Sequence, residues 1–438
     1  MQFSKRLLTL VTALSFIVMA AGQSIASAQT QSAAPTGTFE FMSWWTGGEA
    51  PALKALTDLY SKKYPNVKLV NSGIAGGSGV AAQAVLKTRL LGGNPPDTFQ
   101  VHAGQELIGT WVVANRMLPL DDLFASQGFN DKFPKGLLDL LSYNGHVWSV
   151  PVNIHRANVL WYVPANLKKW GVDVPKTWDD FFAACTKLKA AGVSALALGP
   201  NWTQVHLFET ILLATLGPDD YVKIWKGGVD WTSDKVKAAF TTYGKVLDCA
   251  NKDYDSLTDW IPAAELVVQG KAAFQVMGDW EDGWLRAVKN LTPNKDYGWA
   301  PAPGTAGSFD MLADSFGLPK SIKNSDATIA WLDLIGSVEG QNAFNPLKGS
   351  IPARTDADVK NAKGADGKPL YSVYSQSAAD DWASNKIVPS LWHGAAAPDS
   401  FKNDFATVIS VFNAQRDADA AGAAAQGLAV LSGMAKGS

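Results

Sequence analysis

The chain has 438 residues, 47% of them hydrophobic, and a formal charge of −2 at pH 7. A chain with a slight acidic excess is a poor partner for nucleic acid. Its length exceeds what one small core needs and indicates two domains of ordinary size.

The first residues have the pattern of a cleavable export signal. Lys5 and Arg6 precede an apolar run at 7–21, and a small-residue cleavage pattern follows at 26–28. The run is too short to span a bilayer permanently, and no cysteine follows to accept a lipid. We expect a signal peptide at 1–28 and a mature chain that is exported and released. Losing two basic residues brings the formal charge to −4.

After the signal peptide, short β-type runs alternate with helical patterns as far as about residue 101, as in a repeated β-α-β scheme. Strands are predicted at 38–43, 67–71 and 98–101, and helices at 50–63 and 80–91. This alternation favours an α/β architecture with largely parallel sheets.

Two adjacent tryptophans, Trp44 and Trp45, follow the first strand, and Glu49 comes after a two-glycine turn. Flat aromatic faces cover the C–H surfaces of a sugar ring, and a carboxylate accepts hydrogen bonds from its hydroxyls. A sugar is therefore the first candidate ligand. The structural alternatives are core packing for the indoles and, for Glu49, an acid that offsets the dipole of the helix beginning near Pro51.

Gln100 and His102 flank Val101 in the third predicted strand, so both should point to one side of it. They stand at the carboxyl end of that strand, where open α/β sheets bind ligands. The alternative for His102 is an ordinary hydrogen-bonded structural histidine.

Turn signals divide the middle of the chain. Asn144 and Gly145 predict a hairpin, because its turn needs positive φ at both central residues. Thr177 with Asp180 resembles a capping box that opens a helix, and a strand is expected at 194–198. A second α/β lobe therefore begins after about residue 150.

Cys185 and Cys249 are the two cysteines of the chain. In an oxidising compartment they can form a disulfide, and the alternative is two buried free thiols. The five histidines are too dispersed to predict a metal site, and no nucleophile motif, phosphate-binding glycine loop or cofactor motif is present.

Proline and glycine cluster again at 301–307, before a strand-like stretch at 309–318 and a helical pattern at 326–338. We expect a second crossing between lobes here, although a surface loop gives the same signal. The remainder is expected to be mostly helical, with an Ala/Gly-rich end that frays from Ala420 onward.

Seven segments in this order and spacing carry a family resemblance: 41–49 (FMSWWTGGE), 93–103 (GNPPDTFQVHA), 143–151 (YNGHVWSVP), 175–181 (PKTWDDF), 269–274 (QGKAAF), 278–280 (GDW) and 347–352 (LKGSIP). With them the chain resembles the extracellular solute-binding proteins of ABC-type sugar importers, most closely the periplasmic glucose-binding proteins of proteobacteria. The resemblance implies a two-lobed periplasmic-binding-protein fold with hinge strands and a ligand cleft. It implies an N-terminal lobe of 29–150 and 309–352 and a C-terminal lobe of 151–308 and 353–438.

The same resemblance implies a ligand site built from both lobes. The residues that match it are Trp44, Trp45, Glu49, Gln100, His102, Trp260, Asp279, Trp280, Asp314, Lys348 and His393. Trp111, Trp178, Trp231 and Trp331 are expected to be structural. The implied ligand is a monosaccharide, glucose before mannose, galactose or xylose. The implied protein is a periplasmic monomer without metal or cofactor that delivers its sugar to an ABC permease in the inner membrane.

Two other classes of protein fit parts of the pattern. An exported glycoside hydrolase or lyase would use Glu49, Asp279 or Glu281 as its paired carboxyls, at one of two set separations. A secreted lectin would hold a glycan without a closing motion. The absence of a catalytic motif favours a binding protein that is not an enzyme.

Overall fold

The computed structural model describes residues 34–416 and 419–435, so the predicted signal peptide at 1–28 lies outside the described residues. Within the described part, none of the helices combines the length and the apolar character that crossing a membrane requires.

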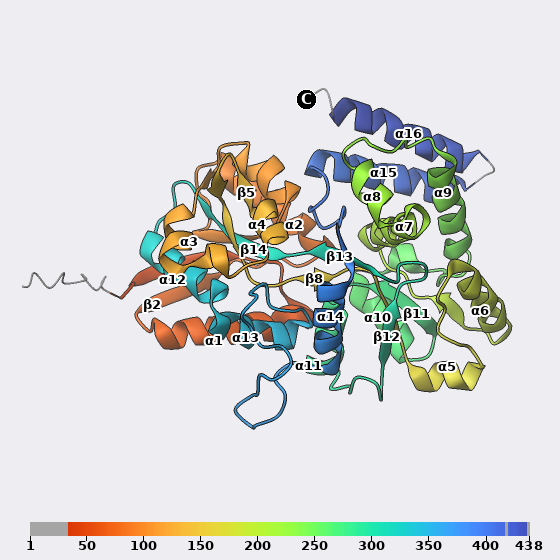
Figure 1. The fold of residues 1–438 in the computed structure, drawn as a ribbon, viewed down its shortest axis with the longest axis horizontal. Helices are drawn as coiled ribbons and strands as arrows, with labels where there is room; N and C mark the ends of the chain where they lie inside the picture. Colours follow the sequence, from red (N-terminus) through yellow and green to blue (C-terminus); the bar gives the residue numbers. More distant parts are fainter. Residues whose placement is uncertain (1–33, 417–418, 436–438) are drawn as a thin grey trace, which may run out of the picture. The chain divides into compact units, whose positions relative to one another are not determined.

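The first sheet has the strand order β2-β1-β3-β14-β4, with β7 also paired to β14; Figure 1 labels β2 and β14. Its strands are β1 (Gly37–Met42), β2 (Val67–Asn71), β3 (Thr98–His102), β4 (Met117–Leu118), β7 (Ser149–Pro151) and β14 (Asp314–Pro319). β1 is parallel to β2 and β3, whereas β14 is antiparallel to each of its neighbours. A strand from residue 314 onward thus completes a sheet that begins at residue 37.

Two further sheets follow in the middle of the chain. The second has the order β10-β11-β9-β12, and the third has the order β15-β13-β8. Their strands are β8 (His155–Arg156), β9 (Val159–Tyr162), β10 (Ser194–Leu196), β11 (Ala272–Met277), β12 (Gly298–Pro301), β13 (Ser308–Leu312) and β15 (Lys386–Pro389). β9 is antiparallel to β11 and β12. The prediction of largely parallel sheets is therefore wrong, because β14 in the first sheet and β9 in the second pair antiparallel with all of their neighbours.

Helices cover these sheets. They are α1 (Ala50–Lys63), α2 (Val80–Leu91), α3 (Asp121–Gln127), α4 (Lys135–Leu141), α5 (Pro164–Trp170), α6 (Trp178–Ala190), α7 (Asn201–Leu216), α8 (Pro218–Ile224), α9 (Asp234–Leu247), α10 (Trp260–Val268), α11 (Trp280–Ala287), α12 (Ser325–Gly336), α13 (Val338–Lys348), α14 (Val373–Ser384), α15 (Asp399–Gln415) and α16 (Ala420–Ala435). α1 packs against α13, and α7 packs against α9 and α15. α16 is a helix packed on α15 and α9, where the sequence predicted a frayed end (Figure 1).

Local sequence signals account for several of these elements. The predicted helices at 50–63 and 80–91 and the strand at 67–71 are confirmed at both ends. The Thr177 hydroxyl accepts a hydrogen bond from the backbone N–H of Asp180, and the Asp180 carboxylate accepts one from the backbone N–H of Thr177. These two bonds form the predicted capping box. Asn144 and Gly145 have φ of 52° and 81° and join β5 (Ser142–Tyr143) to β6 (His146–Val147) as a hairpin.

The stretch at 309–318, predicted as one strand, is two strands in different sheets. β13 belongs to the third sheet and β14 to the first, and Ala313 alone separates them. The chain makes the opposite passage between β7 and β9, by way of the short strand β8. Apolar composition continues through both strands, so hydrophobicity cannot reveal the change of sheet.

Candidate ligand-binding site

A cavity of about 210 Å³ is lined by His102 and Asp314 of the first sheet, by His155 and Leu312 of the third sheet, and by residues of loops and helix ends. Its volume falls below the roughly 300–1,000 Å³ of pockets for drug-sized ligands, so it suits a smaller molecule. Nine of the predicted site residues line it: Trp44, Trp45, Glu49, His102, Trp260, Trp280, Asp314, Lys348 and His393. The four tryptophans expected to be structural are not among the lining residues.

Tryptophans from several elements form the apolar part of the wall. Trp44 follows β1, and Trp260 and Trp280 begin α10 and α11. These three side chains are 5–8% exposed, and each keeps some surface open to the cavity. Trp45 is 1% exposed and packs against Phe316 and Phe344, with ring centroids 5.6 and 4.5 Å away. Most of the Trp45 indole therefore belongs to the core.

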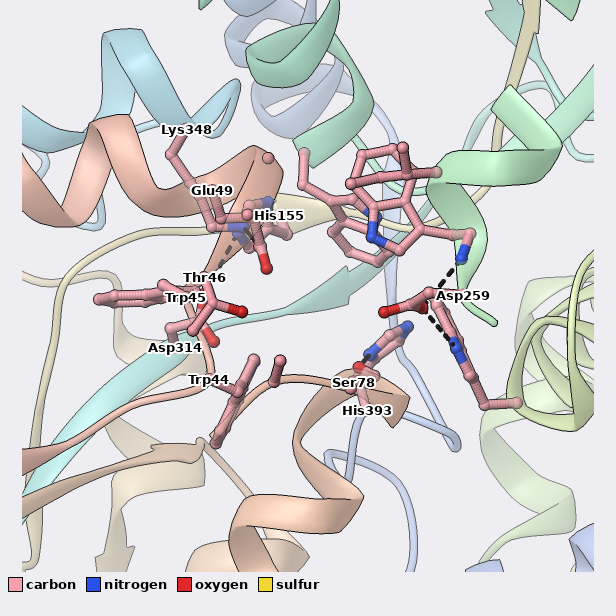
Figure 2. A pocket seen from close by; sticks show the side chains of 18 of the residues that line it. Trp44, Trp45, Thr46, Glu49, Ser78, His155, Asp259, Asp314, Lys348 and His393 are labelled. Carbon is pink, nitrogen blue, oxygen red and sulfur yellow. Dashed lines mark hydrogen bonds and ion pairs between the residues drawn. The ribbon is translucent and has the colours of Figure 1, made fainter. Parts of the chain in front are cut away.

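Glu49 and Lys348 form an ion pair at the cavity, with 2.5 Å between Oε1 and Nζ (Figure 2). Glu49 is the N-cap residue of α1, and Lys348 is the last residue of α13. Each charge thus has the sign that the dipole of its own helix end favours. Burial raises the pKa of Glu49, although the nearby Lys348 ammonium acts in the opposite direction.

Lys348 is held in place by its surroundings. Its Nζ lies 5.6 Å from the centroid of the Trp280 ring, within the range of a cation–π interaction. The next residue, Gly349, has a φ of 88°, and a Cβ there would lie 2.2 Å from the carbonyl oxygen of Asp279. Only glycine permits this approach of the α13 end to the start of α11.

His155 is a lining residue that the sequence analysis did not select. Its Nδ1 bonds Oδ1 of Asp279, and its Nε2 lies 3.2 Å from Oδ2 of Asp314. Burial and Lys348 both act to lower the pKa of His155, but the two carboxylates outweigh them and raise it. The pKa of Asp314 is lowered despite burial, chiefly by its bond to His155. We call Glu49, Lys348, His155 and Asp314 the charged wall.

Gln100 and Asp279 are not among the lining residues, although the sequence analysis placed both against the ligand. Gln100 donates to Oδ1 of Asp314 at 2.8 Å and accepts from the Ser43 hydroxyl at 2.7 Å. Asp279 is fully buried and accepts from the backbone N–H of Arg156 at 3.0 Å. Both side chains hold lining residues in place from behind. Strand alternation correctly paired Gln100 with His102 but could not show that other side chains cover Gln100.

A second buried network stands behind His102. Nδ1 of His102 lies 2.7 Å from Oε2 of Glu106, and Nζ of Lys402 lies 3.8 Å from the same oxygen. Burial acts to raise the pKa of Glu106, but His102 and Lys402 outweigh it, so this pKa is lowered. Lys402 also pairs with Asp399 at 2.8 Å. The His102 ring is thereby oriented with Nε2 away from Glu106.

His393 lies in a part of the cavity wall without carboxylates in direct contact. Its Nδ1 is 3.2 Å from the Ser78 hydroxyl (Figure 2). Its Nε2 is 3.3 Å from Nδ1 of His206. Burial lowers the pKa of His206 to about 4 and that of His393 well below its usual range. We call Ser78, His393 and His206 the neutral corner.

Trp202 and Asp259 complete the aromatic side and were also missed. The Trp202 indole N–H donates to Oδ1 of Asp259 at 3.0 Å, and the Trp260 backbone N–H donates to the same oxygen at 2.9 Å. Burial raises the pKa of Asp259. Trp202 is the second residue of α7, six residues after β10 ends, so a rule that considers only residues at strand ends does not find it.

Two other predictions concern cysteine and metal. Cys185 and Cys249 form a disulfide with a Cα–Cα distance of 5.9 Å, joining α6 to the end of α9 away from the cavity. Among the residues that the structure describes, no group of three or more His, Cys, Asp or Glu side chains is arranged to hold a metal ion.

Comparison with known proteins assigns the family. The sequence pattern of the bacterial extracellular solute-binding proteins matches residues 45–342. The chain belongs to this family. The cavity between the sheets of this solute-binding protein is therefore the expected place for its solute.

Two relatives are similar over nearly the whole chain. An uncharacterised ABC transporter extracellular-binding protein of Pyrococcus horikoshii is 39% identical, over 94% of this chain and 93% of its own length. A probable sugar-binding periplasmic protein of Mesorhizobium japonicum is 34% identical, over 87% of this chain and 90% of its own length.

Among solved structures, the bacterial solute receptor AcbH, described with an exclusive preference for β-D-galactopyranose, superposes with a TM-score of 0.79 at 19% identity. The match covers 91% of this chain and 99% of the receptor. The two-lobed periplasmic-binding-protein fold predicted for this solute-binding protein is confirmed.

Proposed function

We propose that this chain is the periplasmic sugar receptor of an ABC-type importer and that it binds a monosaccharide, glucose in the first place. The observation that carries the proposal is one small cavity with indoles on several sides and charged groups between them. The name of the Mesorhizobium relative supports a sugar as the solute. The name of the Pyrococcus relative supports transport, and the names of both relatives support a location outside the cytoplasm.

The chemistry of the wall suits a polyhydroxylated ring. Indole faces cover C–H surfaces, while Glu49, Asp314 and Lys348 offer acceptors and donors for hydroxyls. Hydrogen bonds to charged groups contribute roughly 1.5–3 kcal/mol each, and micromolar affinity needs only about 8 kcal/mol. A few such bonds together with stacking are therefore sufficient for a sugar with about a dozen heavy atoms.

The lobe boundaries belong to the same proposal. Residues 29–150 with 309–352 would form one lobe, and residues 151–308 with 353–438 the other. The pairing of β14 with β3 and the packing of α13 on α1 support the first grouping. The packing of α15 and α16 with α7 and α9 supports the second. Ligand would then favour closure by binding the closed arrangement better.

Mutation of the wall tests the site. Replacing Trp280 or Glu49 with alanine should weaken glucose binding by at least roughly 2 kcal/mol, because stacking area or the partner of Lys348 is lost. Titration calorimetry measures the change. Trp148→Ala and Glu40→Ala are matched controls, since Trp148 lies outside the cavity wall and Glu40 pairs with Arg89 away from it. Unchanged affinity in both cavity variants would contradict the site.

The choice of sugar needs a separate measurement. A bound ligand raises apparent stability by mass action, so thermal shifts with glucose, mannose, galactose and xylose rank the candidates. Glucose should give the largest shift at equal concentration. A larger shift with another sugar would mean that the protein is a sugar receptor but that glucose is not its preferred ligand.

The rival functions make different predictions. For a glycoside hydrolase, Asp279 and Glu281 are poorly placed, because both are buried and neither is among the residues that line the cavity. Release of reducing sugar from a panel of glycosides would nevertheless favour the enzyme. A lectin needs no closure, so small-angle scattering without compaction on adding glucose would favour that reading over transport.

A further inference from the structure

The turn Gly77–Gly79 carries a side chain, that of Ser78, which contacts His393 at the edge of the cavity. Ser78 has a φ of 53°, in the left-handed region that is unfavourable for a residue with a Cβ. Gly76, Gly77 and Gly79 around it also have positive φ. Residues held in such conformations are often found at functional sites, which makes Ser78 a candidate for a role in binding.

The same turn packs against a wall of the cavity. A Cβ at position 79, where φ is 95°, would lie 2.9 Å from Cε3 of Trp44, so glycine is required at this contact. Trp44 and the turn therefore fix each other, and the Ser78 hydroxyl has a defined position opposite His393 (Figure 2).

The hydrogen bonds behind Ser78 have a single consistent direction. Nε2 of His206 lies 3.1 Å from the carbonyl oxygen of Ala157, which can only accept, so Nε2 carries the proton. Nδ1 of a neutral His206 is then an acceptor and receives the N–H of His393 at Nε2. Nδ1 of a neutral His393 is in turn an acceptor, and the Ser78 hydroxyl donates to it.

This direction requires that both rings be neutral. His206 is 1% exposed and His393 is 1% exposed, and burial lowers the pKa of each ring. Each imidazole therefore carries one proton at neutral pH, and the carbonyl of Ala157 decides where both protons are.

We propose that Ser78 is a specificity-determining residue that meets one ligand hydroxyl only as an acceptor, and that His206 is a positioning residue that imposes this polarity through His393. The inference rests on the proposed function and deepens it. Both ring nitrogens of His393 already form hydrogen bonds within the protein. The ligand is therefore expected to contact the oxygen of Ser78 and not the His393 ring. A ligand group at this corner must donate a hydrogen bond, as a sugar hydroxyl can.

The tautomers can be tested on the protein without any sugar. In the full chain labelled with 15N-histidine, long-range 1H–15N correlation spectra distinguish Nε2–H from Nδ1–H rings. We expect the Nε2–H form for His206 and His393 at pH 7. His206→Phe removes the acceptor and should leave His393 as a mixture of forms, whereas His146→Gln, on the surface, should not change it. A predominantly Nδ1–H ring at His393 in the unaltered protein would overturn the proposal.

The polarity at Ser78 can be tested with glucose and its monodeoxy and monodeoxyfluoro analogues. Fluorine cannot donate, so at one ring position both analogues should bind roughly 3- to 10-fold more weakly than glucose. Ser78→Gly removes the hydroxyl and tolerates the positive φ, so this variant should lose the preference for the hydroxyl at that position alone. If the fluoro analogue keeps the affinity of glucose at every position that Ser78→Gly affects, Ser78 donates and the proposal fails.

The two experiments separate this inference from the proposed function. If glucose does not bind at all, the proposed ligand is wrong, while the tautomers still decide the polarity of the corner. If glucose binds and Ser78→Gly changes neither its affinity nor the ranking of the analogues, the receptor stands and the role of Ser78 is wrong.

Discussion

The charged wall lines the same small cavity as Ser78 and His393 of the neutral corner, but the two groups differ in whether their buried side chains carry charge. The charged wall keeps its ions and balances them, with Lys348 on Glu49 and His155 between two carboxylates. In the neutral corner, His206 and His393 stay uncharged, because burial lowers their pKa values. Histidine therefore has opposite properties in two parts of one site, and its direct partners determine which.

This contrast also divides the work of recognition. Ions in a buried site form strong hydrogen bonds but are costly when a partner is lost. Neutral groups contribute less energy, but an ordered chain of them fixes which partner donates. We infer that the charged wall supplies most of the affinity and that the neutral corner supplies discrimination.

Removal of a charge from the charged wall should have the largest effect. Lys348→Met leaves Glu49, whose side chain is only 17% exposed, without its partner and should lower the free energy of unfolding by about 3 kcal/mol at pH 7. Chemical denaturation measures the loss. The double variant Glu49→Gln with Lys348→Met should recover part of it.

Lys54→Met is the matched control for this prediction. Lys54 and Asp58 form an ion pair at 2.5 Å on the surface, with side chains 72% and 63% exposed. Loss of that pair should cost less than about 1 kcal/mol. Equal losses in the two lysine variants would mean that the charged wall is not a special environment.

A smaller effect is expected for His155→Gln. At pH 6 this substitution should lower the free energy of unfolding by about 1.5–3 kcal/mol, because His155 bonds two carboxylates. The raised pKa of His155 gives a stabilisation that is complete below the unfolded value of about 6.5 and is lost as pH rises through the folded value. The difference between the two proteins should therefore narrow from pH 6 to pH 9, and denaturation at several pH values measures it. A difference that widens toward pH 9 would contradict a protonated His155.

The smallest effect on stability is expected for His206 in the neutral corner. Its contribution should change with pH in the opposite direction to that of His155. The pKa of His206 is lowered to about 4, so between roughly pH 6.5 and 4 the unfolded chain binds a proton that the folded chain does not. Because of this group, the free energy of unfolding should fall by up to about 2 kcal/mol between pH 7 and pH 5. His206→Phe should remove that part of the pH dependence. Parallel stability curves for the two proteins over this range would show that His206 is not kept neutral by burial.

Local signals predicted much of this molecule. Helix periodicity gave α1 and α2, the capping pair gave the start of α6, and the Asn-Gly turn gave the β5–β6 hairpin. Motif resemblance located nine lining residues over some 350 positions, from Trp44 to His393. Each of these signals depends on residues that are close in sequence or on a pattern already known for the family.

The missed features depend on contacts between distant residues. His155 acquires its role from Asp279 and Asp314, which are more than 120 residues away along the chain. Gln100 points to the side that strand alternation predicts. Its amide oxygen, however, accepts hydrogen bonds from the Ser43 hydroxyl and the Trp44 backbone N–H. Likewise, composition along 309–318 contains no sign that one strand ends and another begins in a different sheet.

The placement of His155 and Asp314 constrains how this receptor can change over time. His155 lies in the short strand β8 and Asp314 is the first residue of β14, so both stand next to the points where the chain passes from one sheet to another. If the protein closes on its solute by bending at these points, as proposed, then residues that face the cavity also carry the bend. Engineering a new solute preference at either position would therefore also retune how readily the two halves come together, and variants should be screened for both traits at once.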